Sequence, residues 1–324
     1  MKTKFFIGPM SKNVVDSIIE FNKIRNENVG IIPSRRQVEF DGGYSNNWTT
    51  RGLREYAPGL IIKRDHAGPS QGNVEDDGYE SLKEDCNYMD IIHIDPWKKY
   101  PSYADGLKHT IAMIEYCFKE NPKIKFEVGT EESIRRFEPL ELDNLMNDLE
   151  KKLSPAIFDN IQYLVIQSGT SLKENENTGK YDQSRLEDMI NICKKNNVLS
   201  KEHNGDYMPE KLINEKMSLG LDSINIAPEF GLIETETYLD KIGNDEKLIN
   251  EFWVLCYESK RWEKWVSKNF DPLKNRIELI KICGHYILSN YDFINRIKIK
   301  FKNIDTLIVN KIINKLNKLH GYKT

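Results

Sequence analysis

Short apolar runs recur along the first three quarters of the chain, and longer segments with a different spacing separate them. Eight runs are rich in β-branched and aromatic residues and are mostly four to six residues long, which is too short for helices. We therefore predict eight strands. They cover residues 4–8, 29–32, 60–65, 90–95, 124–129, 163–169, 198–203 and 222–227.

The segments between these runs mostly place apolar residues three or four positions apart, which is the spacing of one helix face. In residues 104–119, for example, this face carries Leu107, Ile111, Ile114 and Phe118. Residues 13–27, 140–153 and 184–196 show the same pattern, and the segment after 29–32 is the least helical. Strands that alternate with helices predict parallel βαβ units.

Eight such units within residues 1–243 match the size of a (β/α)8 TIM barrel, an α/β fold. A doubly wound open sheet is the alternative, but no GxGxxG loop follows the first strand to support it. From residue 244 the strand pattern largely stops, and residues 246–267, 273–289 and 305–319 look helical. We predict a barrel over residues 1–243 and a C-terminal helical extension over 244–324, packed on the barrel as a cap or a partner surface.

The composition excludes several classes of protein. The chain has 324 residues, 39% of them hydrophobic, and its net charge is only -3, so nothing indicates a nucleic-acid partner. No segment approaches the roughly 18 apolar residues of a membrane span, and the apolar run near the N-terminus is too short for a signal peptide. Five scattered cysteines without a CxxC pair predict buried free thiols. We therefore expect a cytoplasmic protein with no membrane partner.

Polar side chains gather at the carboxyl ends of the predicted strands, where the active sites of (β/α)8 barrels form. The candidates are Asp65 and His66 after the third strand, His93 and Asp95 on the fourth, Glu131 after the fifth and His203 at the end of the seventh. Imidazole and carboxylate groups together suit a divalent first-row metal, zinc above all, with manganese or cobalt as alternatives. His66 and His203 are the expected ligands, whereas His93 suits a ligand or a structural role equally.

A second set of polar residues at the same rim suits contacts with a substrate and its phosphate. These residues are Arg35, Arg36, Gln167, Ser168, Gly169, Thr170, Asn204 and Asn225. Arg35 and Arg36 suit a phosphate clamp or a solvated loop. The turn at residues 168–170 could offer backbone N–H groups to a phosphate.

Five strand-end motifs together resemble a known family. RDHAGP, IIHIDPW, VGTE, VIQSGT and EHNGDY occur in that order, one per strand from the third to the seventh. They are similar to the non-catalytic subunit of class II tagatose-bisphosphate aldolases, a (β/α)8 barrel related to the zinc-dependent class II aldolases. The extension is also similar, around RWEKW and the final helix, so the resemblance covers most of the chain.

The resemblance implies roles for single residues. The pair Asp65-His66 is similar to the Asp-His pair of catalytic class II aldolases, which implies that His66 binds the metal and that Asp65 moves the proton of the substrate's C4 hydroxyl. His203 matches their histidine ligand near the end of the seventh strand. Glu131 matches the acidic residue that closes the fifth strand.

The chain also departs from the catalytic aldolases. Gln167-Ser168 stands where they have another histidine ligand, and their glycine-rich loop after the fifth strand is missing. A site with three histidines is therefore not expected, and the third ligand would be Asp95, Glu131 or Gln167.

The implied activity is metal-dependent retro-aldol and aldol chemistry on a ketose phosphate. C4 epimerisation of the fructose 6-phosphate/tagatose 6-phosphate type suits the departures best, and aldol cleavage is the nearest alternative. Two other hypotheses remain. The chain could be a non-enzymatic subunit that stabilises a class II aldolase chain, or a barrel that only binds a sugar phosphate. The dense ionisable groups at the strand ends favour an enzyme. Besides the sugar phosphate, the implied partners are an aldolase chain or further copies of this chain.

Overall fold

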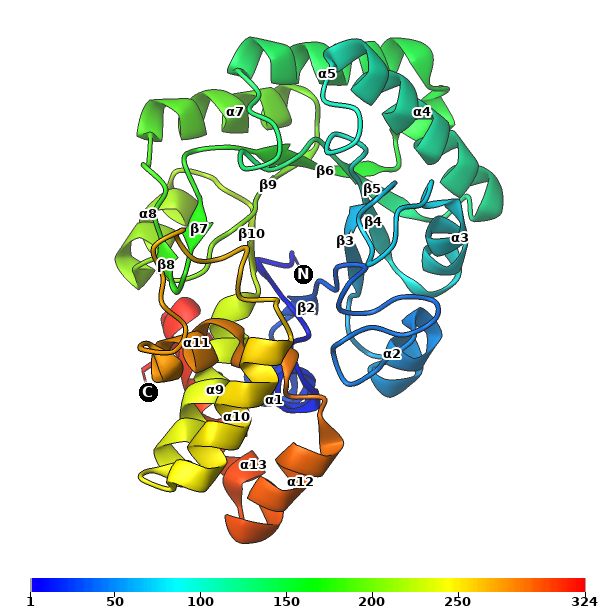
Figure 1. Cartoon of the computed structure of the whole chain (residues 1–324). Helices are drawn as coiled ribbons and strands as arrows, with labels where there is room; N and C mark the ends of the chain where they lie inside the picture. Colours follow the sequence, from blue (N-terminus) through cyan, green and yellow to red (C-terminus); the bar gives the residue numbers. More distant parts are fainter. Residues whose placement is uncertain (1, 324) are drawn as a thin grey trace.

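An eight-stranded parallel sheet, rolled into a barrel, forms the core of the computed structural model, which describes residues 2–323 (Figure 1). The strands are β1 (Phe5–Ile7), β2 (Gly30–Ile31), β3 (Lys63–Ala67), β4 (Ile91–Ile94), β5 (Lys125–Val128), β6 (Ile161–Ile166), β9 (Leu199–Glu202) and β10 (Ser223–Ile226). Their order is β2-β1-β10-β9-β6-β5-β4-β3, and isolated bridges pair Ile31 with Ile62 and Ser34 with Asp65 at the remaining gap. The predicted TIM barrel is confirmed.

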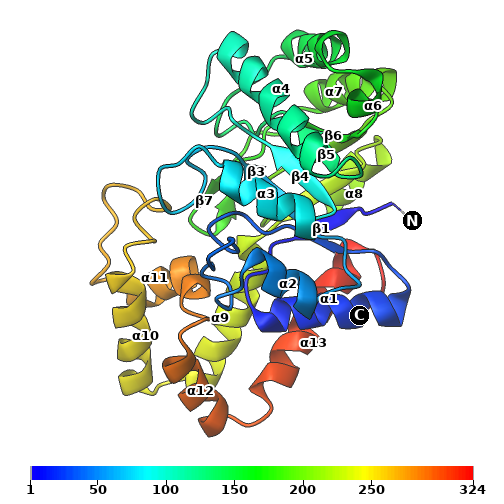
Figure 2. The same ribbon diagram turned by 90° about the vertical axis from the view of Figure 1, so that its right-hand side faces the viewer.

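Helices surround the barrel and follow its strands (Figures 1 and 2). They are α1 (Lys12–Arg25), α2 (Thr50–Tyr56), α3 (Tyr79–Tyr88), α4 (Tyr103–Glu120), α5 (Pro139–Lys152), α6 (Pro155–Phe158), α7 (Gln183–Lys195), α8 (Glu210–Ser218) and α9 (Pro228–Ile242). Ser11 caps α1 by accepting a hydrogen bond from the Val14 N–H, and the left-handed Asn26 ends it. The weakly helical segment after β2 forms only the short α2.

The strands are buried on both sides, as a barrel covered by helices requires. β4, with the sequence Ile-Ile-His-Ile, is buried along its whole length. One side of each strand packs on the helices in the main hydrophobic core, and Phe6, Ile32, Ile91 and Tyr163 form a second apolar cluster. Lys201 lies next to this second cluster, and its Nζ atom is 3.2 Å from the centre of the Phe6 ring.

The C-terminal extension forms α10 (Glu246–Glu258), α11 (Arg276–Cys283), a 3-10 turn (Gly284–Tyr286), α12 (Tyr291–Lys300) and α13 (Ile304–Leu319). These helices gather on one side of the barrel, and α13 packs on both α1 and α9 (Figure 2). The helix predicted over residues 246–267 stops earlier, at Glu258, because Lys260 adopts a left-handed conformation with φ of 56°. Residues 259–275 form an irregular segment that carries Trp262, Lys264 and Trp265.

A short hairpin, not predicted from the sequence, supports this irregular segment. β7 (Leu172–Lys173) and β8 (Glu176–Asn177) lie in the loop after β6, and the Glu174 N–H donates to the Trp265 carbonyl at 3.1 Å. All five cysteines are buried and unpaired, as predicted. Among the helices within residues 2–323, none combines the length and apolar character needed to cross a bilayer.

Candidate metal centre and active site

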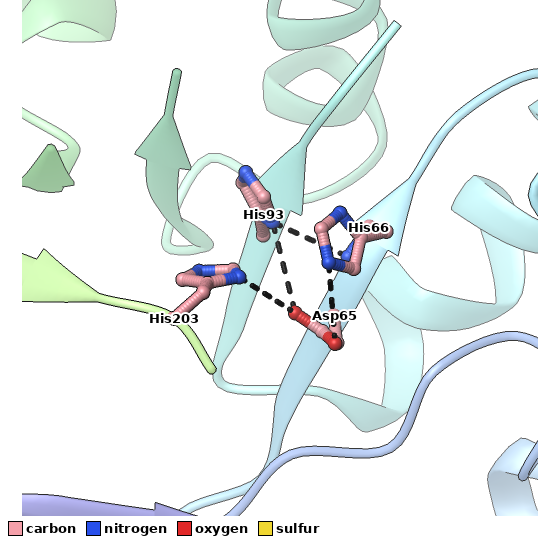
Figure 3. Close-up of side chains that lie close together, drawn as sticks. All are labelled: Asp65, His66, His93 and His203. Carbon is pink, nitrogen blue, oxygen red and sulfur yellow. Dashed lines mark hydrogen bonds and ion pairs between the residues drawn. The ribbon is translucent and has the colours of Figure 1, made fainter. Parts of the chain in front are cut away.

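Four side chains converge at the carboxyl ends of three strands (Figure 3). Asp65 and His66 come from β3, His93 from β4, and His203 follows β9, and one ligand atom of each lies within 4.8 Å of the others. The Oδ1 atom of Asp65 is 3.8 Å from Nδ1 of His93 and 3.7 Å from Nδ1 of His203, while its Oδ2 is 3.6 Å from Nε2 of His66. Because these four residues could hold a metal ion, we refer to them as the metal-site cluster.

A local irregularity of β3 brings its two members of the cluster together. Adjacent residues of a regular strand point to opposite faces, so Asp65 and His66 should not both face the barrel interior. His66 has a φ of 45°, and the pairing of β3 with β4 shifts register between Arg64 and Ala67. A bulge of this kind re-aims a side chain, and strained backbone of this kind is concentrated at functional sites.

The outer nitrogen of each imidazole has a fixed acceptor. Nδ1 of His66 lies 2.6 Å from a carboxylate oxygen of Asp95, Nε2 of His93 lies 3.0 Å from the carbonyl oxygen of Gly129, and Nε2 of His203 lies 2.7 Å from Glu127. Each of these nitrogens therefore donates a proton. In the neutral rings the inner nitrogens carry lone pairs and lie 3.6–3.8 Å from the carboxylate oxygens of Asp65. The inner nitrogen of His93 also accepts a hydrogen bond from the His66 backbone N–H at 3.3 Å. Histidines whose outer nitrogens are held in this way are typical of metal sites.

The acceptors behind the imidazoles are themselves held in place. The Asp95 carboxylate accepts further hydrogen bonds from the Thr130 hydroxyl at 3.0 Å and the Trp97 N–H at 3.2 Å. Asp95 therefore lies behind His66, outside the metal-site cluster, whereas the sequence suggested it as a ligand. The cluster contains His93 in its place, a third histidine that the sequence comparison with the aldolases did not lead us to expect.

Glu127 supports His203 from inside the barrel. Its carboxylate forms an ion pair with the fully buried Lys63 and lies 3.9 Å from Nζ of Lys201. Burial alone would raise the pKa of Glu127, but the neighbouring Lys63 and Lys201 hold it well below its ordinary value. Glu127 thus remains a carboxylate that accepts a hydrogen bond from Nε2 of His203.

Glu131 lies at the edge of the cluster. Its Oε2 atom is 3.6 Å from Nε2 of His66 and 3.9 Å from Nδ1 of His203, and it accepts a hydrogen bond from Asn204 at 2.8 Å. Burial would raise the pKa of Glu131, but hydrogen bonding and charge from His66, with the charge of His203, lower it to about 2. The carboxylate is therefore ionised at neutral pH and close enough to act on a ligand at the cluster.

The cluster fits a metal cation by its charge and by its unsatisfied groups. Among residues 2–323, the buried Oδ1 atom of Asp65 has no hydrogen-bond partner, which is costly unless another group satisfies it. Burial alone would lower the pKa of His66, but Asp65, Asp95 and Glu131 raise it well above its ordinary value. A positive charge is thus favoured at this point. Three imidazoles and a carboxylate suit zinc or another first-row ion.

The cluster opens into a cavity of about 310 Å³, which is enough for one small ligand. Asp65, His66 and His203 line its inner end. The extension lines the opposite side with Lys264, Trp265, His285 and Tyr286. The mouth of the barrel is therefore covered in part by residues that are remote in the sequence.

Two asparagines among the predicted substrate-binding residues line this cavity. Asn225 is buried at 6% exposure, and neither its amide nitrogen nor its amide oxygen has a partner among residues 2–323. Asn204 also lines the cavity, where its left-handed backbone directs the amide to Glu131. Asn225 is thus free to bond a hydroxyl of a ligand, and Asn204 positions Glu131.

Arg35 is committed elsewhere. It is buried at 2% exposure, it pairs with Glu39 at 2.6 Å and with Asp76, and it donates to the carbonyl oxygen of Gly68 at 2.7 Å. The neighbouring Arg36 lines the cavity, and within residues 2–323 its side chain donates only to the carbonyl oxygen of Gly72, at 3.2 Å. The two arginines therefore differ, and only Arg36 is placed to bind a phosphate.

Residues 167–170 form a tightly packed turn. The Gln167 amide accepts from the Phe137 N–H and donates to the carbonyl oxygens of Thr130 and Arg135, all at 2.8 Å. The Ser168 hydroxyl donates to Glu202 at 2.5 Å. These polar groups are engaged in holding the loops after β5 and β6 together.

The rest of this turn faces away from the cluster. A Cβ atom on Gly169, which has a φ of 89°, would lie 1.9 Å from the Lys180 carbonyl oxygen, so the position requires glycine. The Thr170 hydroxyl donates to the His203 carbonyl at 2.9 Å. Gly169 and Thr170 line a separate open groove beside α7 and not the cavity at the cluster.

Asp206 is a cavity residue that the sequence did not single out, although it lies in the EHNGDY motif. One of its carboxyl oxygens accepts hydrogen bonds from the N–H groups of Ala227 and Glu229, both at 2.8 Å. Burial and the like charge of Glu229 raise the pKa of Asp206 to about 8. The cavity therefore contains a carboxylic acid that retains its proton at neutral pH.

Comparison with known proteins gives a fold but no relative by sequence. No family model matches the chain, and no curated protein matches it. A crystal structure described as a probable tagatose 6 phosphate kinase from Sinorhizobium meliloti 1021 is 14% identical, with a TM-score of 0.77 over 99% of this chain and 100% of that chain. The shared fold thus includes the extension.

Two further solved structures have related architectures. Fructuronate-tagaturonate epimerase from Cohnella laeviribosi is 10% identical, with a TM-score of 0.65 over 98% of this chain and 81% of that chain. Fructose-bisphosphate aldolase from Campylobacter jejuni is 13% identical, with a TM-score of 0.55 over 91% of this chain and 90% of that chain. At such identities the likeness shows the shared fold.

Proposed function

We propose that the protein is a metal-dependent enzyme that performs retro-aldol and aldol chemistry on a ketose phosphate, with C4 epimerisation as its reaction. The observation that carries this proposal is the metal-site cluster. Three imidazoles and an acidic side chain, Asp65, offer ligand atoms that lie within 4.8 Å of one another beside a cavity of ligand size. The names of the structural neighbours, an epimerase and an aldolase, support the same class of reaction.

The residues of the cluster divide into holding and reacting groups. His66, His93 and His203 would hold a divalent ion, which when bound supplies Lewis acidity to the substrate carbonyl. Asp65 takes the proton of the C4 hydroxyl as the C3–C4 bond breaks, because the facing imidazoles lower its pKa despite its burial and keep it ionised. Asp206 carries a proton at another part of the same cavity and can give it to the oxygen formed on re-addition, after which Asp65 loses its proton to solvent and Asp206 regains one from solvent.

The covered mouth of the barrel supports epimerisation over free cleavage. Release of the aldehyde fragment would make the enzyme an aldolase, whereas rotation and re-addition on its other face gives the C4 epimer. Trp265 and Tyr286 of the extension line the cavity, and the Trp265 indole N–H donates to the Tyr286 hydroxyl at 3.2 Å. A wall of this kind retains the fragment and limits the access of water.

The test is turnover by the purified chain. We expect incubation with fructose 6-phosphate and zinc, manganese or cobalt to give tagatose 6-phosphate with little triose product. Triose release without the epimer would make the protein an aldolase. Lack of turnover with any ketose phosphate and metal would refute the enzyme proposal. Stable capture of a class II aldolase chain by an inactive protein would instead support an accessory subunit.

A further inference from the structure

Three cations on the outer side of the cavity have no carboxylate partner. Arg36 follows β2, Lys98 follows β4 and Lys264 belongs to the irregular segment of the extension, and all three line the cavity of the metal-site cluster. Within residues 2–323 none of them forms an ion pair, whereas the adjacent Arg35 forms two. Their polar contacts are with backbone carbonyls, from Arg36 to Gly72 and from Lys98 to Ser70 at 3.4 Å.

A fourth cation continues this positive surface. A second cavity of about 330 Å³ shares Arg36, Lys264 and Tyr286 with the first and is also lined by Arg261. The Arg261 guanidinium lies 4.9 Å from the Tyr44 ring and 5.0 Å from the Tyr286 ring, so aromatic faces and not carboxylates hold it. Glu263, which also lines the second cavity, forms no ion pair within residues 2–323.

These charges are close enough to affect one another. Lys264 reaches solvent through the cavity, but the protein atoms around it and the charges of Arg36, Arg261 and Lys98 lower its pKa to about 8. His285, on the same wall, has its pKa lowered to about 3 by burial and by Lys264 and Arg261, so it is neutral. A group of like charges without counter-ions is unfavourable until an anion binds.

We propose that Arg36, Lys98 and Lys264 bind the phosphate monoester of the substrate, and that the C-terminal extension thereby supplies part of the active site. The inference rests on the proposed function, because the phosphate belongs to the ketose that reaches the metal-site cluster. Both sites line one cavity, so a single small molecule can contact them together. Residues 168–170, the other phosphate candidate, line a different groove.

The number of cations points to phosphate rather than carboxylate. A phosphate monoester carries about -1.5 to -2 charges at pH 7 and offers three acceptor oxygens. Arg36, Lys98 and Lys264 can donate hydrogen bonds but accept none, and these three donors equal the three phosphate oxygens in number. The carboxylate of a uronic acid has one charge and two oxygens, and it would leave at least one cation uncompensated.

Direct binding measurements test the inference without any need for turnover. Calorimetry of the whole chain with inorganic phosphate, fructose 6-phosphate, fructose and glucuronate should give binding to the first two only. Lys264→Met should weaken both by about 10- to 100-fold, the loss expected for one charge-assisted contact, with unchanged metal content. Lys268→Met, an exposed lysine of the same segment outside both cavities, should bind as the wild type.

The outcomes separate this inference from the proposed function. Equal phosphate affinity in the wild type and Lys264→Met, or glucuronate binding as tight as fructose 6-phosphate, would overturn the phosphate site. Should Lys264→Met fail to fold, Arg36→Met with Arg36→Lys as its charged counterpart makes the same comparison. Phosphate binding that depends on Lys264 in a protein without turnover would keep the site and refute the enzyme.

Discussion

The position of a few protons governs the candidate chemistry at the scale of single residues. Each imidazole of the cluster donates its outer proton to a fixed acceptor, which leaves a lone pair on its inner nitrogen. The inner nitrogen of His93 accepts a hydrogen bond from the His66 N–H at 3.3 Å, which a bound metal would replace. Asp65 differs from these residues because its buried Oδ1 atom has no hydrogen-bond partner among residues 2–323. Holding and reacting roles can therefore be separated by substitution.

Asp65→Asn should abolish turnover and retain the metal. The amide has nearly the shape of the carboxylate but cannot take a proton, so we expect kcat to fall by about 10²- to 10⁴-fold. The three imidazoles remain, so the metal content and the unfolding midpoint should change little. Steady-state kinetics and elemental analysis of the same preparation check both. An active Asp65→Asn enzyme would remove Asp65 as the base.

His93 and Asp95 should differ in their effect on metal content. His93→Ala removes a member of the cluster, and we expect stoichiometric metal to be lost. Asp95→Asn removes only the acceptor behind His66, and it should weaken metal affinity by about 10- to 100-fold. His109→Ala, whose ring stacks on Tyr100 on the outer side of α4, is the matched control and should bind metal normally. Retention of full metal affinity by His93→Ala would exclude it as a ligand.

Phosphate affinity should depend on pH through Lys264. The protein atoms around Lys264 and the charges of Arg36, Arg261 and Lys98 lower its pKa, Glu131 opposes them, and the result is a pKa of about 8 in the free protein. Since phosphate binds the ammonium form, affinity should be highest between about pH 6, the second pKa of the phosphate monoester, and pH 8, and it should fall above pH 8. Calorimetry with fructose 6-phosphate at pH 7 and pH 9.5 measures the loss.

Lys264→Arg provides the control for that pH dependence. A guanidinium keeps its proton throughout this range, so the affinity of the variant should be nearly constant between pH 7 and pH 9.5. A decline in Lys264→Arg as steep as in the wild type would assign the titration to another group.

At the scale of elements, the loops after the strands place the site. The strand β3 delivers two consecutive side chains to one face only because His66 is left-handed and the ladder shifts register there. The sequence pattern identified the strand and its end, but a two-residue alternation would have sent Asp65 and His66 to opposite sides. His93 and Asp95 are two positions apart, so strand alternation predicts that both side chains point to the same face. Asp95 lies after the end of β4, however, and its carboxylate accepts a hydrogen bond from the Trp97 N–H instead of joining the metal-site cluster.

Gln167 shows how one side chain can connect two such loops. Gln167→Ala removes three hydrogen bonds to the backbone of residues 130–137 and leaves buried donors and acceptors unpaired. We expect the free energy of unfolding to fall by about 2–4 kcal/mol. Gln183→Ala, on the exposed start of α7, should change it by less than about 0.5 kcal/mol. Denaturant unfolding measures both, and equal stabilities would show that the connection is unimportant.

At the scale of the whole molecule, the extension and the barrel share one hydrophobic core. The residues Ile308, Ile312 and Leu316 of α13 are fully buried in that core, and α13 packs against α1 and α9. The Arg25 guanidinium also donates to Asn317 at 3.0 Å. The division at residues 243 and 244 stays a prediction, but the two parts are not expected to unfold separately.

Ile312→Ala tests this shared core. Removal of a fully buried isoleucine side chain should lower the free energy of unfolding by about 2–5 kcal/mol. Unfolding should remain a single transition, because Ile312 belongs to the core that the barrel and the extension share. Ile299→Ala, at a position 77% exposed on α12, is the control and should be nearly neutral. Two separate transitions in Ile312→Ala, monitored by circular dichroism and Trp fluorescence, would show that the extension is an independent unit.

The eight strands, the barrel and most of the residues near its mouth follow from the amino-acid sequence, because strand and helix periodicities are local and the carboxyl ends of parallel strands meet at one face. Which of those residues converge depends on the three-dimensional packing. It brought His93 into the cluster, moved Asp95 behind His66, engaged Arg35 and Gln167 in loop contacts and carried Lys264 from the extension to the cavity. Such choices depend on bulges, loop conformations and long-range packing, which local periodicity does not encode.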